Sequence, residues 1–435
     1  EFGLGVTVDP ATNAVVVGTF SNSVVFAGAT LTNAGLSDLV VAKYAPDGTA
    51  VWGRRLGGAQ EDGPGGVAAD AQGNIYVTGY FKGGVAFGAT TLQTRGAPST
   101  SDAFLCKYDA AGNLLWTQQG GGVNDDRGWA VTVDAEGNAI AVGTYQGTAT
   151  FGTGTQLVGA ANLLPETYVA KYSPAGGLLW ARRFASSRGV VGYAVATDLP
   201  GNVYLTGEFV GAGSFGTNTL SSTGDRDAFV VALSASGETL WSDHLGGALA
   251  DGGRGIGVDA SGGVVVAGYF SDLVKFGSTT VQSAGKKDLF VARYSPAGVL
   301  LWTRVGGGNL DDLATGVAVT PQGQAYVSGF FTTTLTLGSV VLPSAGNADA
   351  WLARFGIDGT LQWITRAGGA GTVADAANGV AVGPGGSVFL VGQTGGAADF
   401  GTNSLTVLNG ADGFATSVWL TEISPLTGTK PFTGS

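Results

Sequence analysis

The sequence predicts an all-β protein, a seven-bladed β-propeller whose blades are four-stranded antiparallel sheets. The first observation is a series of tryptophans spaced 64, 64, 61, 61 and 61 residues apart, namely Trp52, Trp116, Trp180, Trp241, Trp302 and Trp363. A fixed period of this kind indicates a repeat architecture. The second is an apolar alternation of period two inside each repeat, which is typical of strands. The third is the content of 77 glycines, which opposes long helices.

Alignment of the repeated phrase gives seven units of roughly 62 residues. Their first strands begin at Gly5-Val6, Gly66-Val67, Ala130-Val131, Ala194-Val195, Gly255-Ile256, Gly316-Val317 and Gly379-Val380. We expect a single domain over residues 1–435, because all-β folds of this kind exceed the usual domain size. The units fall at approximately 1–56, 57–120, 121–184, 185–245, 246–306, 307–367 and 368–435.

Within a unit, each strand follows from its residue types. The second strand, as in 74–80, and the third, as in 288–294, are rich in β-branched and aromatic residues. Gly73-Asn74 accepts positive φ at little cost and joins the first strand to the second. The turn at 295–298, Ser-Pro-Ala-Gly, leads from the third strand into the Trp-bearing fourth. A short Phe-Gly element, as at Phe87-Gly88, lies between the second and third strands.

A radial arrangement lets each sheet cover its neighbour and leaves only short protected edges, as in a propeller. A parallel β-helix is the structural rival, but its coils are much shorter and lack tight hairpins. Closure of the ring is expected to use the tail 424–432, which resembles a degenerate Ser-Pro turn followed by a fourth strand. Because the sequence has no Met and no apolar leader at its start, we expect a processed or excised chain.

Composition narrows the choice of partners. Charged residues are 12% of the chain, and the net charge of −11 argues against nucleic acid, which calls for a basic patch. No apolar run reaches the ~18 residues of a membrane span, so we expect no membrane insertion. A single Cys excludes an internal disulfide, and a single His excludes metal sites built from several histidines. Surfaces of Ser, Thr, Asn and Gly suggest an extracellular protein.

Several motifs then resemble a known family. Val131-Thr132-Val133-Asp134 with Gly137-Asn138, the run Ile75–Gly79, and Asp102-Ala103-Phe104 with Lys107-Tyr108 recur in register in most units. This phrase resembles the bacterial β-propeller repeat family known as SBBP, over nearly the whole chain. The resemblance implies a secreted or cell-surface protein. It carries no catalytic residue, so the chain is predicted not to be an enzyme and to need no cofactor.

Two series of carboxylates recur in the units. The loops between units hold Asp62, Asp126, Asp251, Asp312 and Asp375. We favour a structural role, in which they accept backbone N–H bonds, over a ring of Ca²⁺ sites, because no calcium-loop ligand pattern is present. A second series, such as Asp38 and Asp288, opens the third strands, and a cation such as Lys43 or Arg293 follows five residues later. These two charges lie on opposite faces of one strand and are expected to pair across blades.

Partner binding is assigned to the places where the repeat changes. Two longer loops precede the third strands of units two and three and supply the candidates Arg95, Ser99, Asn162, Leu163 and Leu164. The non-repeated Trp129, Trp351 and Trp419 are surface candidates, although Trp351 takes the place of Val40, Phe104 and Phe290 and is therefore also a core candidate. The predicted function is a non-catalytic binding or scaffold propeller that engages a protein or glycan at the cell surface.

Two alternatives stay open. A lectin-like role is the first. The second and more distant is a quinoprotein enzyme, because the phrase 109–116 resembles the docking repeat of pyrroloquinoline-quinone dehydrogenases. Those enzymes have eight blades and commonly a vicinal Cys pair, which this chain lacks.

Overall fold

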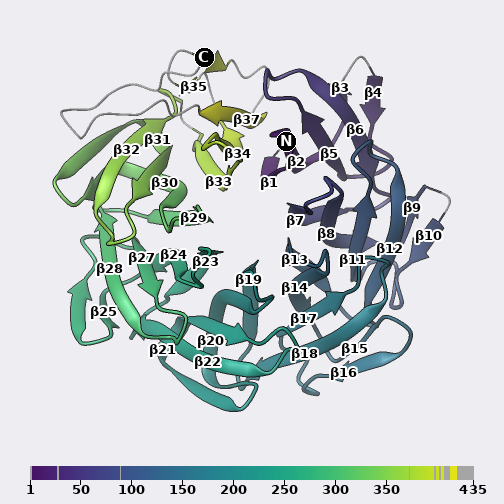
Figure 1. Ribbon diagram of the computed structural model, residues 1–435, viewed down its shortest axis with the longest axis horizontal. Helices are drawn as coiled ribbons and strands as arrows, with labels where there is room; N and C mark the ends of the chain where they lie inside the picture. The colour runs from purple at the N-terminus through teal and green to yellow at the C-terminus, as the bar shows by residue number, and fades with distance from the viewer. Residues whose placement is uncertain are drawn as a thin grey trace.

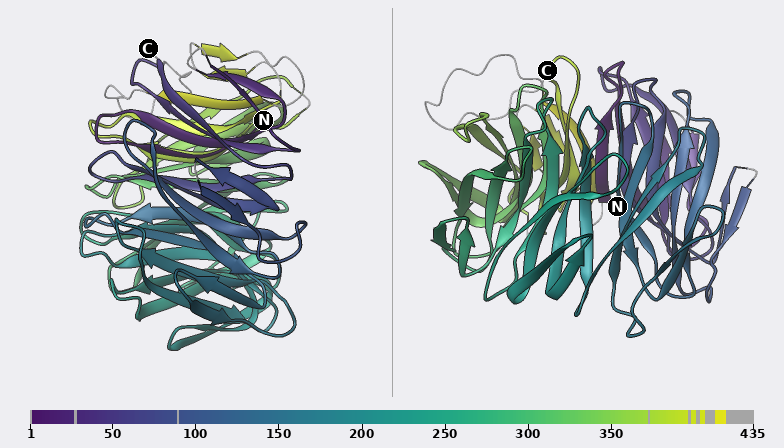
Figure 2. Two further views of the ribbon diagram at one scale, coloured as in Figure 1. Left: turned by 90° about the vertical axis from the view of Figure 1, so that its right-hand side faces the viewer. Right: turned by 60° about the horizontal axis from the view of Figure 1, so that its bottom comes forward.

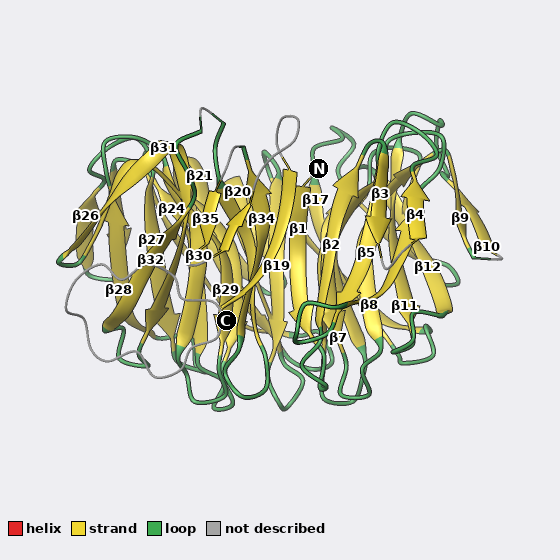
Figure 3. Ribbon diagram, turned by 90° about the horizontal axis from the view of Figure 1, so that it is seen from above, coloured by secondary structure: helices red, strands yellow, loops and turns green. Residues whose placement is uncertain are grey.

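The computed structural model describes residues 2–26, 29–88, 90–371, 373–395, 398–400, 403–405 and 412–418. Within these residues all regular elements are antiparallel strands and no helix occurs, which confirms the predicted all-β class. Accordingly, no described helix is long and apolar enough to cross a membrane. The sheets stand radially around a central axis, and the strands run between the two ends of the molecule (Figures 1, 2 and 3).

The strands follow the repeat. The first three units contain β1 (Phe2–Val8), β2 (Ala14–Phe20), β3 (Ser23–Phe26), β4 (Ala29–Thr32), β5 (Asp38–Tyr44), β6 (Ala50–Leu56), β7 (Gly63–Ala69), β8 (Ile75–Lys82), β9 (Gly84–Phe87), β10 (Thr90–Gln93), β11 (Ser101–Tyr108), β12 (Leu114–Gly122), β13 (Arg127–Val133), β14 (Ala139–Tyr145), β15 (Thr148–Phe151), β16 (Thr155–Val158), β17 (Glu166–Tyr172) and β18 (Leu178–Ser186).

The remaining units contain β19 (Val190–Thr197), β20 (Val203–Phe215), β21 (Asn218–Leu233), β22 (Thr239–Gly247), β23 (Gly252–Val258), β24 (Val264–Phe270), β25 (Leu273–Phe276), β26 (Thr279–Gln282), β27 (Asp288–Tyr294), β28 (Leu300–Gly307), β29 (Asp312–Val319), β30 (Ala325–Leu337), β31 (Val340–Phe355), β32 (Leu361–Ala367), β33 (Ala376–Val382), β34 (Val388–Thr394), β35 (Ala398–Phe400), β36 (Asn403–Leu405) and β37 (Asp412–Val418).

The first strand of each unit lies nearest the axis, and in the first six units the fourth strand lies towards the perimeter, as in the order β1-β2-β5-β6 (Figure 1). The N-terminal strand β1 lies beside β33, and the Asn378 side chain donates a hydrogen bond to the Gly3 carbonyl at 2.8 Å. The predicted fourth strand of the last unit, in the tail 424–432, lies outside the described residues.

The Phe-Gly element is more than the short link that the sequence suggested. It is the turn of a small hairpin, such as β15–β16, which stands at the perimeter (Figure 1). This hairpin pairs with the fourth strand of the preceding unit, where Gly121 of β12 faces Thr150 of β15. In the fourth and sixth units the second and third strands run unbroken through the hairpin, as β20 with β21 and β30 with β31. In the third to sixth units the hairpin therefore extends the sheet of the preceding unit, whereas β3–β4 and β9–β10 form separate two-stranded sheets.

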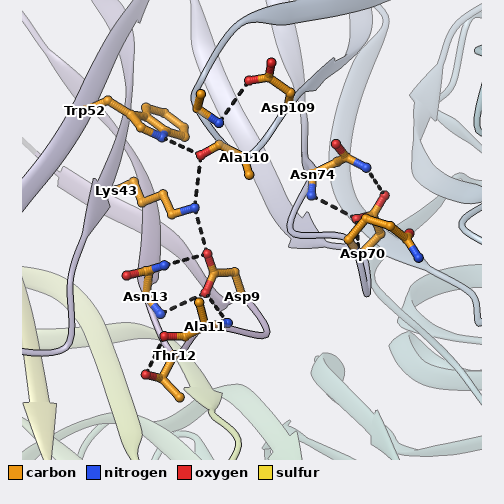
Figure 4. Close-up of polar contacts among 12 residues, drawn as sticks. Asp9, Ala11, Thr12, Asn13, Lys43, Trp52, Asp70, Asn74, Asp109 and Ala110 are labelled. Carbon is orange, nitrogen blue, oxygen red and sulfur yellow. Dashed lines mark hydrogen bonds and ion pairs between the residues drawn. The ribbon is translucent and has the colours of Figure 1, made fainter.

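The repeated tryptophans join consecutive units. The Trp52 indole N–H donates to the Ala110 carbonyl at 3.1 Å, in the turn before the fourth strand of the next unit (Figure 4). The same bond recurs as Trp116 to Pro174, Trp180 to Ala235, Trp241 to Pro296 and Trp302 to Ile357, at 2.9–3.0 Å. The period of the tryptophans thus reflects one such bond at each of these interfaces.

The glycine of that turn must lack a side chain. Gly359 has φ +78°, and a Cβ there would lie 2.6 Å from the Trp302 ring. Gly338 has a similar φ of +62° but nothing within 4 Å of an added Cβ. We expect Gly338→Ala to cost about 1–2 kcal/mol from backbone strain alone. Gly359→Ala should cost about 1–3 kcal/mol more, because it also displaces the indole. Urea unfolding of both variants measures the difference in their free energies of unfolding. Equal decreases in the two variants would mean that the contact between Gly359 and the Trp302 ring does not contribute to stability.

The cations of the third strands do not pair across blades with the carboxylates of that strand series. Lys43 forms an ion pair with Asp9 of its own unit at 2.7 Å and also donates to the Ala110 carbonyl of the next unit (Figure 4). The prediction was wrong because Asp9 lies in the turn between the first and second strands, which brings its carboxylate to the cation. Lys171 with Asp134, at 2.8 Å, and Arg293 with Asp259 repeat the arrangement.

Candidate functional site

The two ends of the molecule carry different residues. The end that we call the linker end holds the loops between units, the starts of the first and third strands and the ends of the second strands. The opposite end, the turn end, holds the Asp9 and Lys43 type of ion pair and the tryptophan bonds. The predicted partner-binding residues Arg95, Ser99 and 162–164, together with the loop carboxylates, lie at the linker end. A side chain that holds neighbouring units together is not free to bind a partner, so the function of each end depends on its remaining side chains.

The loop carboxylates at the linker end bind backbone N–H groups. Asp126 accepts from Gly122 at 2.6 Å and from Gln146 at 3.2 Å, which connects the preceding fourth strand to the second strand of its own unit. The same two positions donate to each of the others, which are Asp62, Asp251, Asp312 and Asp375. This geometry is the one that a structural role requires.

Each loop carboxylate lies close to a third-strand carboxylate. A Cβ on Gly121 would lie within 3.0 Å of both Asp102 and Asp126, so the two carboxylates flank this glycine. Burial raises the pKa of Asp126 to about 8, and that of Asp251 and of Asp312 to about 7, because desolvation outweighs the backbone hydrogen bonds. These groups therefore retain protons well above the pH at which exposed carboxylates lose them.

We expect stability to fall as the pH rises from about 4 to about 8. A carboxyl whose pKa is raised in the folded state binds its proton more tightly there than in the unfolded chain, so its contribution is complete below the unfolded pKa. That contribution is lost as the pH rises through the folded value, about 8 for Asp126. Thermal melts across this range should show the melting temperature decreasing with pH. A melting temperature that rises from pH 5 to pH 8 would contradict this assignment.

A metal at these loops is not expected. Among the described residues no group of three or more His, Cys, Asp or Glu side chains is placed to hold an ion. We expect excess chelator to leave the melting temperature unchanged, since a ligand stabilises the folded state only by binding to it. A large decrease with chelator that Ca²⁺ reverses would overturn the structural role of the loop carboxylates.

The candidates in the first long loop are partly committed to the scaffold. Arg95 donates its Nη1 to the Gly121 and Thr150 carbonyls, both at 2.7 Å, and so bridges the second and third units. Ser99 is exposed near the tip of the loop. Arg95 thus has an architectural contact that the sequence did not reveal, and Ser99 is the freer of the two surface residues.

The second long loop presents an apolar side chain to solvent. Leu163 is 46% exposed and adopts φ +55°, an unusual conformation for a non-glycine residue. Asn162 is exposed and accepts a hydrogen bond from the Leu164 N–H at 3.3 Å, while Leu164 is half-buried. Like the first loop, this segment lies between a perimeter hairpin and a third strand. Both loops remain predicted partner contacts.

Trp129, a surface candidate from the sequence, belongs to a set of non-repeated residues closer to the axis that sequence reasoning otherwise missed. Of the other two non-repeated tryptophans, Trp351 is buried, and Trp419 lies outside the described residues. Each first strand contains a β-bulge near its start, as between Gly128 and Ala130 of β13. A bulge leaves one residue unpaired and re-aims its side chain. The bulged residues are Leu4, Gly65, Trp129, Tyr193, Arg254, Thr315 and Asn378. Their identity changes in every unit, whereas the flanking residues are Gly or Ala in most units.

The bulged residues of the third, fourth and fifth units contact one another. The Trp129 and Tyr193 rings meet edge to face, with centroids 5.9 Å apart. The Arg254 guanidinium lies over the Tyr193 ring, 3.9 Å from its centroid. All three side chains are half-buried. They form a continuous aromatic and cationic surface across three neighbouring units.

Glu208, within β20 of the fourth unit, connects this surface to two further side chains, Arg226 and Tyr269. Its side chain is 7% exposed and accepts hydrogen bonds from Arg254 Nη2 at 3.0 Å and Arg226 Nη1 at 2.6 Å. The Tyr269 hydroxyl also donates to it at 3.2 Å. We call these six residues the rim cluster: Trp129, Tyr193, Glu208, Arg226, Arg254 and Tyr269.

The rim cluster carries excess positive charge. Burial lowers the pKa of Arg254, but the neighbouring Glu208 outweighs this and raises the pKa, so the guanidinium stays charged. Lys287 lies over the Tyr269 ring at 4.6 Å, and Arg127 lies over the Tyr80 ring at 4.5 Å. Two arginines, Arg226 and Arg254, therefore pair with the one carboxylate of the rim cluster, and Lys287 adds a third cation beside Tyr269, in a chain whose net charge is −11.

Comparison with known proteins supports the repeat assignment. The model of the SBBP family, described as a β-propeller repeat, matches residues 51–80, which confirms the family resemblance. An uncharacterised WD repeat-containing protein of Acanthamoeba polyphaga mimivirus is 23% identical over 434 residues, covering 80% of this chain and 31% of that protein. The regulatory protein FlaEY of Caulobacter vibrioides is 28% identical over 214 residues, covering 45% of this chain and 22% of that protein.

One solved structure changes a prediction. The rhamnogalacturonan lyase YesW matches 83% of this chain and 75% of its own, with 13% identity and a TM-score of 0.24. Because that protein is an enzyme, the finding contradicts the prediction that the chain is not an enzyme. At this identity and TM-score the likeness carries no argument about a reaction or a catalytic residue here.

Proposed function

Since the chain carries a β-propeller repeat of the SBBP type, we propose that it is a seven-bladed propeller that binds a protein or glycan partner at its linker end. The seven recurrences of the first strand and the contact between β1 and β33 support the blade count and the closed ring. We further propose that it acts outside the cell or on its surface. The chain spans 31% and 22% of its two curated relatives, so the activity of a larger protein is also a matter of proposal.

The rim cluster is the observation that carries this proposal. In a repeat protein, residues that serve the scaffold recur, as the tryptophan bonds and loop carboxylates do. The bulged positions differ in every unit, and at three consecutive units they carry large side chains that are only half-buried. Large aromatic and arginine side chains of this kind dominate binding energy at interfaces. The two long loops, with Ser99 and Leu163 exposed, lie at the same end.

A glycan is the partner that the aromatic residues favour. Half-buried Trp and Tyr rings offer a flat apolar surface, against which the C–H groups of a sugar ring can pack. The net charge of −11 opposes nucleic acid as a partner. A lectin-like role is therefore the form of the proposal that the rim cluster supports best.

A glycan array probed with labelled protein tests the proposal, with variants that copy another unit. The second unit has Gly65 at the bulged position that Trp129 occupies in the third unit, so the fold should tolerate Trp129→Gly. We expect this variant to lose array binding, while Leu4→Thr, which changes a bulge of the first unit, binds normally. Unchanged binding by Trp129→Gly would place the site elsewhere.

The loops are tested separately. Replacing 95–101 or 159–165 by the shorter 284–287 loop of the fifth unit should weaken binding of the array ligand and leave the far-ultraviolet spectrum unchanged. Normal binding by both loop variants would restrict the site to the rim cluster.

A further inference from the structure

We propose that the rim cluster binds an acidic saccharide, with the carboxylate of a uronic acid residue held by Arg254 and Arg226 and the sugar ring against Trp129 and Tyr193. This inference rests on the proposed binding at the linker end and names the chemical class of its ligand.

The arginines have donors left for an anion. Glu208 accepts a bond from Arg254 through Nη2 and from Arg226 through Nη1, whereas each guanidinium has five N–H donors. The Nε of Arg226 is buried and has no hydrogen-bond partner. Because this Nε is closed to solvent, a ligand would use the other N–H groups of the two guanidiniums that Glu208 leaves free. The Arg226 and Arg254 side chains are 42% and 25% exposed, so a ligand can reach them.

The cations are held in place before a ligand arrives. Arg254 lies over both Tyr193 and Tyr269, 3.9 Å and 5.3 Å from the ring centroids, and is bonded to a buried carboxylate. Ordering a long side chain on binding normally costs affinity. Because the rings and Glu208 already order Arg254, a carboxylate ligand meets a fixed guanidinium, whose planar fork matches its geometry.

The aromatic neighbours favour a saccharide over an acidic peptide. The Trp129 indole N–H donates to the Thr144 hydroxyl at 3.1 Å, so the ring has no free donor and offers only its carbon surface. A flat carbon surface beside a fixed cation suits a ring that has C–H groups on one face and a carboxylate on its edge. A uronic acid residue has both features within one unit.

The test is an array of uronate oligosaccharides, each printed beside its carboxyl-reduced counterpart. The wild-type protein should bind at least one uronate glycan about tenfold or more tightly than the reduced form, and less tightly at high salt. Arg254→Asn, which copies Asn378 of the last unit, should lose this preference. Lys275→Gln, at an exposed perimeter residue, removes the same charge and should keep it.

The outcomes separate the two proposals. Equal binding of acidic and reduced glycans, abolished by Trp129→Gly, would overturn the acidic-ligand inference and leave the proposed binding function standing. Tight binding of an acidic peptide array with no glycan binding would also overturn the inference. An absence of binding to any glycan or peptide would count against both.

Discussion

Replacing Lys171 by Ala is expected to lower the free energy of unfolding by about 3–5 kcal/mol, the usual effect of removing one partner of a buried ion pair. Lys171 Nζ lies 2.8 Å from Asp134, and the two side chains are 5% and 2% exposed. Burial raises the pKa of Asp134, but the hydrogen bonds from Lys171 and Asn138 outweigh it and lower the pKa. Without the lysine, the Asp134 charge stays buried with no cation.

The fourth unit provides the rescue for this variant. It has Ala232 in place of the cation, and the Tyr204 hydroxyl donates to the corresponding Asp198 at 3.0 Å. Ile140 occupies the position of Tyr204 in the third unit. The double variant Lys171→Ala with Ile140→Tyr should recover part of the loss in urea unfolding. A single variant as stable as the wild type would mean that the ion pair contributes nothing to the scaffold.

Gly207→Ala is the second substitution from which we expect a large effect, about 3 kcal/mol. A Cβ at Gly207 would lie 1.9 Å from the Val191 carbonyl oxygen and 2.9 Å from the Gly192 Cα, in the bulged strand that presents Tyr193. Backbone cannot move aside as a flexible side chain can, so the bulge itself must shift. We therefore expect both lower stability and weaker glycan binding.

The control for Gly207→Ala is Gly177→Ala, because the nearest atom to a Cβ there is the Ser173 hydroxyl at 3.4 Å, an ordinary contact. Thermal unfolding and array binding of the two variants are compared with the wild type. If Gly207→Ala binds as tightly as Gly177→Ala does, the bulge of the fourth unit does not position the ligand.

The strands and main turns could be predicted because their signals are local. Alternating apolar residues mark the strands, and glycines with positive φ, such as Gly73 and Gly298, mark the turns. The perimeter hairpins were missed because their strands are only three or four residues long where they are separate, as in β15 and β16. Such short runs give too few alternations to distinguish a strand from a loop.

Apart from Trp129, the residues of the candidate site were missed for a different reason. A β-bulge depends on the pairing between two strands, and a single strand shows no sign of it. In the sequence, the bulge is marked only by a residue that differs between units and is flanked by small residues that recur, as in Gly128-Trp129-Ala130 and Gly253-Arg254-Gly255. The ion-pair partners of Lys43 and Lys171 were predicted wrongly because these partners lie in turns. The prediction considered only which face of a strand each charge occupies, and turn residues have no such face.

Binding at the linker end is the central claim, and a crystal structure of the protein with the tightest glycan from the array tests it most directly. We expect the glycan at the linker end, in contact with Trp129, Tyr193 and Arg254. A glycan bound at the turn end, or against the perimeter strands, would contradict the claim.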